Sequence, residues 1–137
     1  MRVLILCTGN SCRSQMAHGF LQSFAPDWEV HSAGTRPAQQ VNPCAVEVML
    51  EVGIDLSSHT PKSVEVFLDA PWDFVITVCG GANESCPAFV GKVGKRLHIG
   101  FDDPSEVVGS NDYVMSEFRR VRNEIKQAFS AFYNDNR

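Results

Sequence analysis

The sequence reads VLILCTGNSCRSQMAHGFL from Val3 to Leu21, and this stretch decides the fold. Its first four residues form a continuous apolar run, which is typical of a strand buried on both faces of a parallel sheet. The run stops at Thr8-Gly9-Asn10, and a helix is predicted to begin near Ser14 and to end before Ala25-Pro26-Asp27. A buried strand, a tight loop and a helix therefore follow one another at the start of the chain.

Strand and helix signals continue to alternate along the chain. Short strands are predicted at 29–32, 73–78 and 96–99, a helix from the cap Asn42-Pro43 to Gly53, and a shorter helix after Thr60-Pro61. Alternation of this kind predicts an α/β fold in three layers, with a four-stranded parallel sheet and helices on both faces. We expect residues 1–137 to form one domain.

The last predicted element is a long amphipathic helix that starts from a cap near Ser110-Asn111. Apolar residues recur in it every three or four positions, at Val114, Phe118, Val121, Ile125, Phe129 and Phe132. This spacing places them on one face of a helix, which is expected to cover the sheet. We interpret this apolar stripe as part of the hydrophobic core.

Composition excludes several classes of protein. Among 137 residues, 44% are hydrophobic and 20% are charged, which is typical of a soluble globular domain. The formal net charge of −4 argues against nucleic acid or an anionic membrane as a partner. The apolar start is too short for a signal peptide and no run is long enough to cross a membrane. We expect a cytoplasmic monomer.

The loop after the first predicted strand has the pattern C-x5-R, from Cys7 to Arg13, followed by Ser14. A short glycine-containing turn directs consecutive backbone N–H groups at one oxyanion, and the following helix adds its positive end. Arg13 can hold two oxygens with its planar guanidinium. The same donors stabilise a thiolate, so Cys7 is predicted to be a nucleophile with a lowered pKa.

Each residue of this loop has an expected part in the site. The oxyanion-binding set is Thr8, Gly9, Asn10, Ser11, Cys12, Arg13 and Ser14. Asn10 tolerates positive φ and can brace the loop, and Ser14 can donate a hydrogen bond to the sulfur of Cys7. Taken alone, the pattern is also compatible with a buried cysteine that merely ends a strand, but its place between strand and helix favours the functional interpretation. Cys12 is interpreted as a packing residue.

Two further cysteines stand at a predicted strand end. Of the five cysteines, Cys79 ends the strand 75–78 and Cys86 follows it after small and polar residues, which predict a flexible loop. An odd count in a reducing compartment favours transient over permanent disulfides. Unrelated thiols are one alternative, and a zinc site with the distant His98 is a weaker one. In a parallel sheet Cys79 shares an edge with Cys7, which makes a thiol relay possible.

An acidic pair, Asp102-Asp103, precedes Pro104 after the fourth predicted strand. A carboxylic acid at this edge of the sheet can protonate a leaving oxygen. An Asp-Pro sequence is also a common turn. The interpretation as a catalytic acid therefore depends on the presence of the C-x5-R loop elsewhere in the sequence.

Nearly the whole chain resembles the thioredoxin-coupled arsenate reductases built on the low-molecular-weight protein tyrosine phosphatase fold. The first loop and helix turn, from Cys7 to Ala17, resemble that family's signature. Cys79 and Cys86 fall where the family has its two redox cysteines. Further matches are Ser32-Ala33-Gly34, Asn42-Pro43, Ser58-His59-Thr60, Phe101-Asp102-Asp103-Pro104 and the stretch 118–125.

The resemblance implies a mechanism. Cys7 attacks arsenic, Asp103 protonates the departing oxygen, and Arg13 with the loop amides holds the remaining oxygens. Cys79 then attacks Cys7 and releases arsenite, and Cys86 attacks Cys79 to give a disulfide that thioredoxin reduces. Phosphate and sulfate are expected competitors of arsenate. No metal or organic cofactor is expected, since both electrons come from thiols.

Some relatives bind a structural potassium ion with acidic residues near the loop. At two of those positions this chain has His18 and Lys62. The ammonium group of Lys62 can replace the charge of the ion, so activity independent of potassium is expected. The pair Gly80-Gly81 is a second departure, and it bears on how the segment after Cys79 unwinds.

Two other functions use the same residues. A phosphatase would use Cys7, Arg13 and Asp103 in the same way, with water in place of Cys79 in the second step. Phosphatases of this fold usually have tyrosines after the Asp-Pro, where this chain has Ser105-Glu106-Val107, so only a weak phosphatase side activity is expected. A non-catalytic anion or redox sensor would keep the loop intact without turnover.

Overall fold

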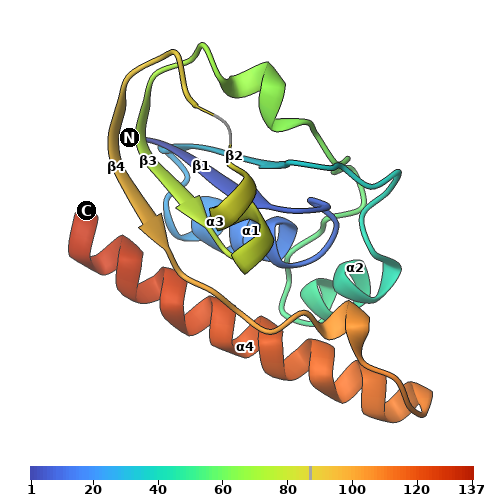
Figure 1. Cartoon of the computed structure of the whole chain (residues 1–137). Helices are drawn as coiled ribbons and strands as arrows, with labels where there is room; N and C mark the ends of the chain where they lie inside the picture. Colours follow the sequence, from blue (N-terminus) through green and yellow to red (C-terminus); the bar gives the residue numbers. More distant parts are fainter. Residues whose placement is uncertain (87) are drawn as a thin grey trace.

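The computed structural model describes residues 1–86 and 88–137, and its centre is a four-stranded sheet (Figure 1). The strands are β1 (Arg2–Cys7), β2 (Glu29–Gly34), β3 (Trp72–Thr77) and β4 (Val93–His98). They lie in the order β2-β1-β3-β4, and every pair is parallel. The predicted four-stranded parallel sheet is therefore confirmed. The strand order switches direction at β1, so the loop after Cys7 opens where ligands bind in such sheets.

The helices largely follow the predicted pattern. They are α1 (Arg13–Phe24), α2 (Pro43–Leu50), α3 (Gly80–Ser85) and α4 (Asn111–Asn136), with short 3₁₀ helices η1 (Val64–Phe67) and η2 (Pro104–Glu106). Asn42 caps α2 as predicted, its side chain accepting a hydrogen bond from Cys44 N at 2.9 Å. The helix ends before Gly53, whose φ of +83° belongs to the turn that follows. Ser110 caps α4, also as predicted.

The segment after Cys79 corrects one expectation. The sequence predicted a flexible loop between the two cysteines, but the backbone forms helix α3 from Gly80 to Ser85. Cys79 is the N-cap of this helix rather than the end of β3, and its sulfur accepts a hydrogen bond from Ala82 N at 3.4 Å. A Cβ on Gly81 would lie 2.8 Å from the hydroxyl of Thr8. The absence of a side chain at Gly81 thus lets α3 pack directly against the first loop.

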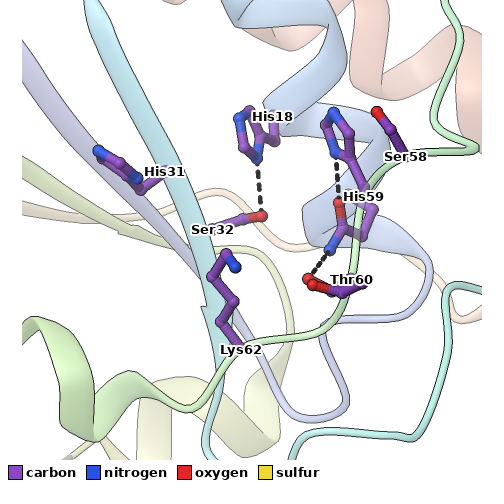
Figure 2. A pocket seen from close by; sticks show the side chains of 8 residues that line it. His18, His31, Ser32, Ser58, His59, Thr60 and Lys62 are labelled. Atoms are coloured by element: carbon purple, nitrogen blue, oxygen red, sulfur yellow. Dashed lines mark hydrogen bonds between the residues drawn. The ribbon is translucent and has the colours of Figure 1, made fainter.

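Helices cover both faces of the sheet. Helices α1 and α4 pack together on one face, where Phe74 of β3 meets Phe132 of α4 at a ring distance of 5.0 Å. On the other face, His31 of β2 packs against Phe67 of η1 at 5.3 Å. Between α1, β2 and residues 58–62 lies a polar cavity of about 180 Å³ (Figure 2).

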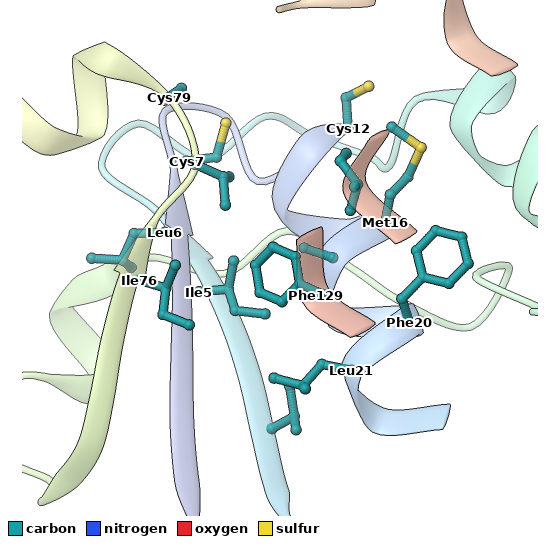
Figure 3. Packing of buried hydrophobic residues seen from close by; sticks show 14 of the residues in the cluster. Ile5, Leu6, Cys7, Cys12, Met16, Phe20, Leu21, Ile76, Cys79 and Phe129 are labelled. Carbon is teal, nitrogen blue, oxygen red and sulfur yellow. The ribbon is translucent and has the colours of Figure 1, made fainter. Parts of the chain in front are cut away.

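The core lies between the sheet and α4, with α1 beside them (Figure 3). The predicted stripe of α4 is buried at Phe118, Val121, Ile125, Phe129 and Phe132, whereas Val114 is half-buried and Met115 is buried beside it. Burying each large apolar side chain contributes about 1.5–3 kcal/mol. This packing fixes β1 and α1, and hence both ends of the loop between them. None of the helices in the described residues combines the length and apolar character needed to cross a membrane.

Candidate active site

The site forms at the carboxyl ends of two neighbouring strands, β1 and β3. Cys7 is the last residue of β1, and Cys79 follows β3 by two residues. Figure 3 shows both side chains at the same end of the sheet. Each is buried, with 4% of Cys7 and 3% of Cys79 exposed. The predicted proximity of these two thiols is present, and Cys86 lies elsewhere, at the far end of α3.

The loop between Cys7 and Arg13 is held from outside by its carbonyl groups. Thr8 O, Gly9 O and Ser11 O accept backbone hydrogen bonds from Arg36, Ala38 and Asn42, at 2.8–2.9 Å. In the part of the chain that the structure describes, no hydrogen bond has a backbone N–H of residues 9–14 as its donor. Those N–H groups are therefore available to an oxyanion. A Cβ on Gly34 would lie 2.5 Å from Thr8 O, so only glycine allows β2 to approach the loop this closely.

Asn10 braces the loop from within. Its φ is +51°, as the sequence predicted for an asparagine in a tight loop. Its side-chain amide donates to Ser14 Oγ at 2.8 Å, and its side-chain oxygen accepts from Lys62 N at 2.9 Å. Within the described residues, the predicted hydrogen bond from Ser14 to the sulfur of Cys7 does not form. Ser14 accepts from Asn10 instead, which leaves its own proton for another acceptor.

A second tier of residues supports Asn10, and sequence reasoning gave it no role. Gln15 Nε2 donates to the backbone oxygen of Asn10 at 3.1 Å and to its side-chain oxygen at 3.2 Å. His59 Nδ1 lies 2.9 Å from Gln15 Oε1. Because that oxygen can only accept, Nδ1 of His59 carries the proton. The match at Ser58-His59-Thr60 was a signal for this contact, but the pairing across 44 positions is not visible in sequence.

Arg13 joins the loop to the segment that follows β4. Its Nη1 donates to Phe101 O at 3.1 Å, and its Nη2 lies 3.2 Å from Asp103 Oδ2. Its Nε is buried and has no hydrogen-bond partner among the described residues. A buried donor without an acceptor is costly, so an oxyanion that accepts from Nε would relieve this cost.

The structure distinguishes between the two acids before Pro104. Asp103 faces Arg13, and its other oxygen accepts from Ser105 N at 3.0 Å and Ser105 Oγ at 2.6 Å. Asp102 is 76% exposed and pairs with Arg120. Asp103 is therefore the acid that lies beside the loop.

The charge of the thiol pair differs from the prediction. The hydrogen bond with Cys79 and then burial raise the pKa of Cys7, although Arg13 opposes them. The pKa of Cys79 is lowered to about 4, first by the hydrogen bond from Cys7, with further hydrogen bonds from Thr8 and Ala82. The prediction of a lowered pKa at Cys7 is therefore wrong for this arrangement. In this arrangement the hydrogen-bonded pair shares one proton, and the negative charge is favoured on Cys79.

Thr8 has a contact that the sequence did not predict. Its hydroxyl lies 3.4 Å from the sulfur of Cys79. Since the charged sulfur accepts hydrogen bonds, the hydroxyl donates. Thr8 therefore connects the anion loop to the second cysteine.

The remaining cysteines lie apart from this pair. Burial raises the pKa of Cys12, which is 4% exposed, in agreement with its interpretation as a packing residue. Cys44 is half-buried at the start of α2 and packs against the core. Cys86 is half-buried and directly follows α3. At 1.5 Å per residue, α3 separates the backbone of Cys86 from that of Cys79 by roughly 10 Å.

Comparison with known proteins agrees with this geometry. The family model for low molecular weight phosphotyrosine protein phosphatase matches residues 2–136. An arsenate reductase of Shouchella clausii (strain KSM-K16) is 47% identical over 131 residues, which cover 95% of this chain and 93% of that protein. An arsenate reductase of Bacillus subtilis (strain 168) is 44% identical over the same length and covers the same shares.

A solved structure is similar throughout. It is described as an arsenate reductase in the phosphate binding state, with a TM-score of 0.81 and 32% identity, covering 98% of this chain and 97% of that one. The match extends over strands, loop and helices alike. The chain belongs to the low molecular weight phosphotyrosine protein phosphatase family.

Proposed function

We propose that this protein, acting through residues 1–137 as one domain, reduces arsenate to arsenite by a relay of Cys7, Cys79 and Cys86, and that thioredoxin regenerates it. The observation that carries the proposal is the pairing of Cys79 with Cys7, which begins the loop closed by Arg13. An oxyanion loop alone suits any phosphoryl-type chemistry, whereas a second thiol in contact with the nucleophile suits a redox reaction. The arsenate reductases among its relatives support the choice of substrate.

In the first step, Cys7 attacks the arsenic atom. The proton that the two thiols share shifts toward Cys79 as the sulfur of Cys7 bonds to arsenic, so the pair itself supplies the nucleophile. Arg13 and the N–H groups of residues 9–14 hold the arsenate oxygens, and Asp103 gives a proton to the oxygen that departs as water. An S–As bond forms and an As–O bond breaks.

In the second step, Cys79 gives its proton to solvent, and its sulfur attacks the sulfur of Cys7. The S–S bond forms as the S–As bond breaks, and its electron pair stays on arsenic, which leaves as arsenite. Arsenic gains two electrons and the two thiols lose them. The contact of Thr8 with Cys79 favours the thiolate form that this attack needs.

In the third step, Cys86 attacks Cys79 and frees Cys7. Because α3 separates the two sulfurs, this step requires the helix to unwind. A helix of six residues that begins with two glycines is intrinsically weak, which favours such opening. Cys86 is half-buried in the reduced protein, and unwinding of α3 exposes the disulfide between Cys79 and Cys86 to the dithiol of thioredoxin.

A phosphatase remains the second candidate, because Cys7, Arg13 and Asp103 would serve hydrolysis of a phosphate ester equally well. That function leaves the contact between Cys7 and Cys79 without a use. We therefore expect phosphatase activity only as a weak side reaction.

The test is consumption of NADPH by thioredoxin reductase and thioredoxin in the presence of the protein and arsenate. The proposal predicts oxidation of one NADPH for each arsenate reduced, with inhibition by phosphate or sulfate. Rapid hydrolysis of an aryl phosphate without arsenate-dependent NADPH oxidation would contradict it and support the phosphatase. Binding of arsenate without turnover of either substrate would support a sensor.

A further inference from the structure

Cys86 has charged and polar neighbours to which the proposed relay assigns no role. Cys86 lies in a cavity of about 220 Å³ on the β4 side of the sheet. The cavity is lined by Val75, Thr77, Cys86, Arg96, Leu97 and His98. Three of these come from β4, which is the edge strand on this side of the sheet. Among the lining residues of this cavity, Arg96 has the only permanent positive charge.

Arg96 is held over an aromatic ring beside the cysteine. Its guanidinium carbon lies 5.3 Å from the centre of the Phe89 ring, a cation–π contact that restricts where the charge can go. Thr77 Oγ1 and His98 Nδ1 lie 2.7 Å apart, so His98 is engaged with β3. Arg96 therefore has a defined place next to Cys86.

The charge and hydrogen bonding of Arg96 act on the sulfur. Burial raises the pKa of Cys86, which disfavours the thiolate, while the charge of Arg96 and its hydrogen bond to Cys86 lower it. The thiolate is the nucleophile in disulfide exchange, so the balance between these two effects determines how much reactive Cys86 is present at neutral pH.

We propose that Arg96 is a positioning residue that stabilises the thiolate of Cys86 for its attack on Cys79. The inference rests on the proposed relay. Cys86 first loses its proton to solvent. Its thiolate then forms a bond to the sulfur of Cys79 while the bond between Cys79 and Cys7 breaks, and Cys7 leaves as a thiolate beside Arg13. One disulfide replaces another, and no external oxidant or reductant takes part.

The expected size of the effect follows from exchange chemistry. Arg96 is exposed, so solvent weakens its interaction with the sulfur. Each unit of pKa changes the thiolate fraction tenfold, but a more basic thiolate is also more nucleophilic, which cancels nearly half of the change. Replacement of Arg96 should therefore slow the attack by Cys86 about three- to tenfold at pH 7.

The test compares Arg96→Met and Arg96→Lys with the native protein, and uses Lys95→Met as the matched control. Lys95 precedes Arg96 on β4 but lines a different cavity, against Phe132 of α4. Reduced protein is mixed with one equivalent of arsenate without thioredoxin, the reaction is stopped with an alkylating agent, and the disulfides are mapped over time. In parallel, alkylation of Cys86 by iodoacetamide is followed from pH 6 to pH 10 without arsenate.

In Arg96→Met, we expect the first disulfide and arsenite at the native rate, but slower conversion to the disulfide of Cys79 and Cys86. The difference in conversion rate between Arg96→Met and the native protein should vanish near pH 10, and the pH midpoint for alkylation of Cys86 should rise in Arg96→Met. Arg96→Lys should restore most of the native conversion rate and most of the native midpoint. A native midpoint in Arg96→Met, or an equal slowing at every pH, would overturn the inference. Absence of arsenite in the native protein would instead contradict the relay, while the alkylation midpoint would still decide the role of Arg96.

Discussion

Arg13 and Asp103 form an ion pair in which Nη2 of the arginine lies 3.2 Å from Oδ2 of the carboxylate. The side chains are only 13% and 25% exposed, so the pair is largely shielded from solvent. An arriving oxyanion competes with Asp103 for Arg13 and brings a second negative charge close to the carboxylate. Two negative charges at this distance favour protonation of the acid, which prepares Asp103 to donate its proton.

Replacement of Asp103 by Asn should therefore slow the chemical step and leave the fold intact. Loss of a general acid typically lowers rates 10²–10⁴-fold, and we expect a reduction of about that size in arsenite formation during a single turnover. Asp102→Asn is the control, because Asp102 is exposed and pairs with Arg120. Equal rates in the two variants would exclude Asp103 as the acid.

Replacement of Cys79 by Ser should make Cys7 easier to ionise. The hydrogen bond and the negative charge of Cys79 both raise the pKa of Cys7, and the variant lacks the charge. We expect faster alkylation of Cys7 by iodoacetamide at pH 7 than in the native protein, measured at that residue by mass spectrometry. Slower alkylation would mean that Cys79 promotes ionisation of Cys7 in the resting pair.

Acid should destabilise the protein partly through His18. Burial, with the nearby His59, His31 and Lys62, lowers the pKa of His18 to about 3. Below pH 6.5 the unfolded chain binds a proton at this position that the folded protein does not bind, so stability falls as pH falls toward 3. From pH 7.5 to pH 5 this accounts for about 2 kcal/mol.

Urea unfolding at pH 7.5 and pH 5 measures this effect. In His18→Gln, the loss of unfolding free energy between the two pH values should be smaller by that amount. The comparison within each protein removes any pH-independent cost of losing the contact between His18 and Ser32. An unchanged loss would show that His18 titrates normally.

Activity should not depend on potassium. His18 and Lys62 line the same cavity of about 180 Å³, next to Gln15, which supports Asn10 in the anion loop (Figure 2). The ammonium group of Lys62 therefore supplies a positive charge in this cavity. Turnover in potassium chloride and sodium chloride at equal ionic strength is expected to be the same. A clear rise with potassium alone would contradict this prediction.

The fold was predictable because its signals are local. The apolar run before Cys7, the cap at Asn42-Pro43 and the stripe of α4 each depend on near neighbours in sequence, and each forms as expected. Helix α3 was not predicted, because glycines and polar residues have weak helix propensity. Its capping by Cys79 is a local contact made by an unusual cap residue, whereas its packing against Thr8 is a tertiary contact.

The proximity of four residues of the candidate site could be predicted from the sequence, whereas the charge state of the two thiols could not. Loop pattern and strand order bring Cys7, Arg13, Cys79 and Asp103 together as expected. The pKa of Cys7 was predicted to be lowered, but its contact with Cys79 raises it, and the sulfur of Cys79 is the one that receives the hydrogen bonds of Thr8 and Ala82. Such bonds cannot be inferred from spacing.

The most direct test of the relay compares the native protein with Cys86→Ser in two assays. One measures arsenite formed per protein molecule without thioredoxin, and the other measures continuous arsenate-dependent NADPH oxidation with thioredoxin and its reductase. The relay predicts about one arsenite per molecule in both proteins, and continuous turnover in the native protein alone. Continuous turnover by Cys86→Ser at the native rate would contradict the role of Cys86, and absence of arsenite from both would contradict reduction by Cys7 and Cys79.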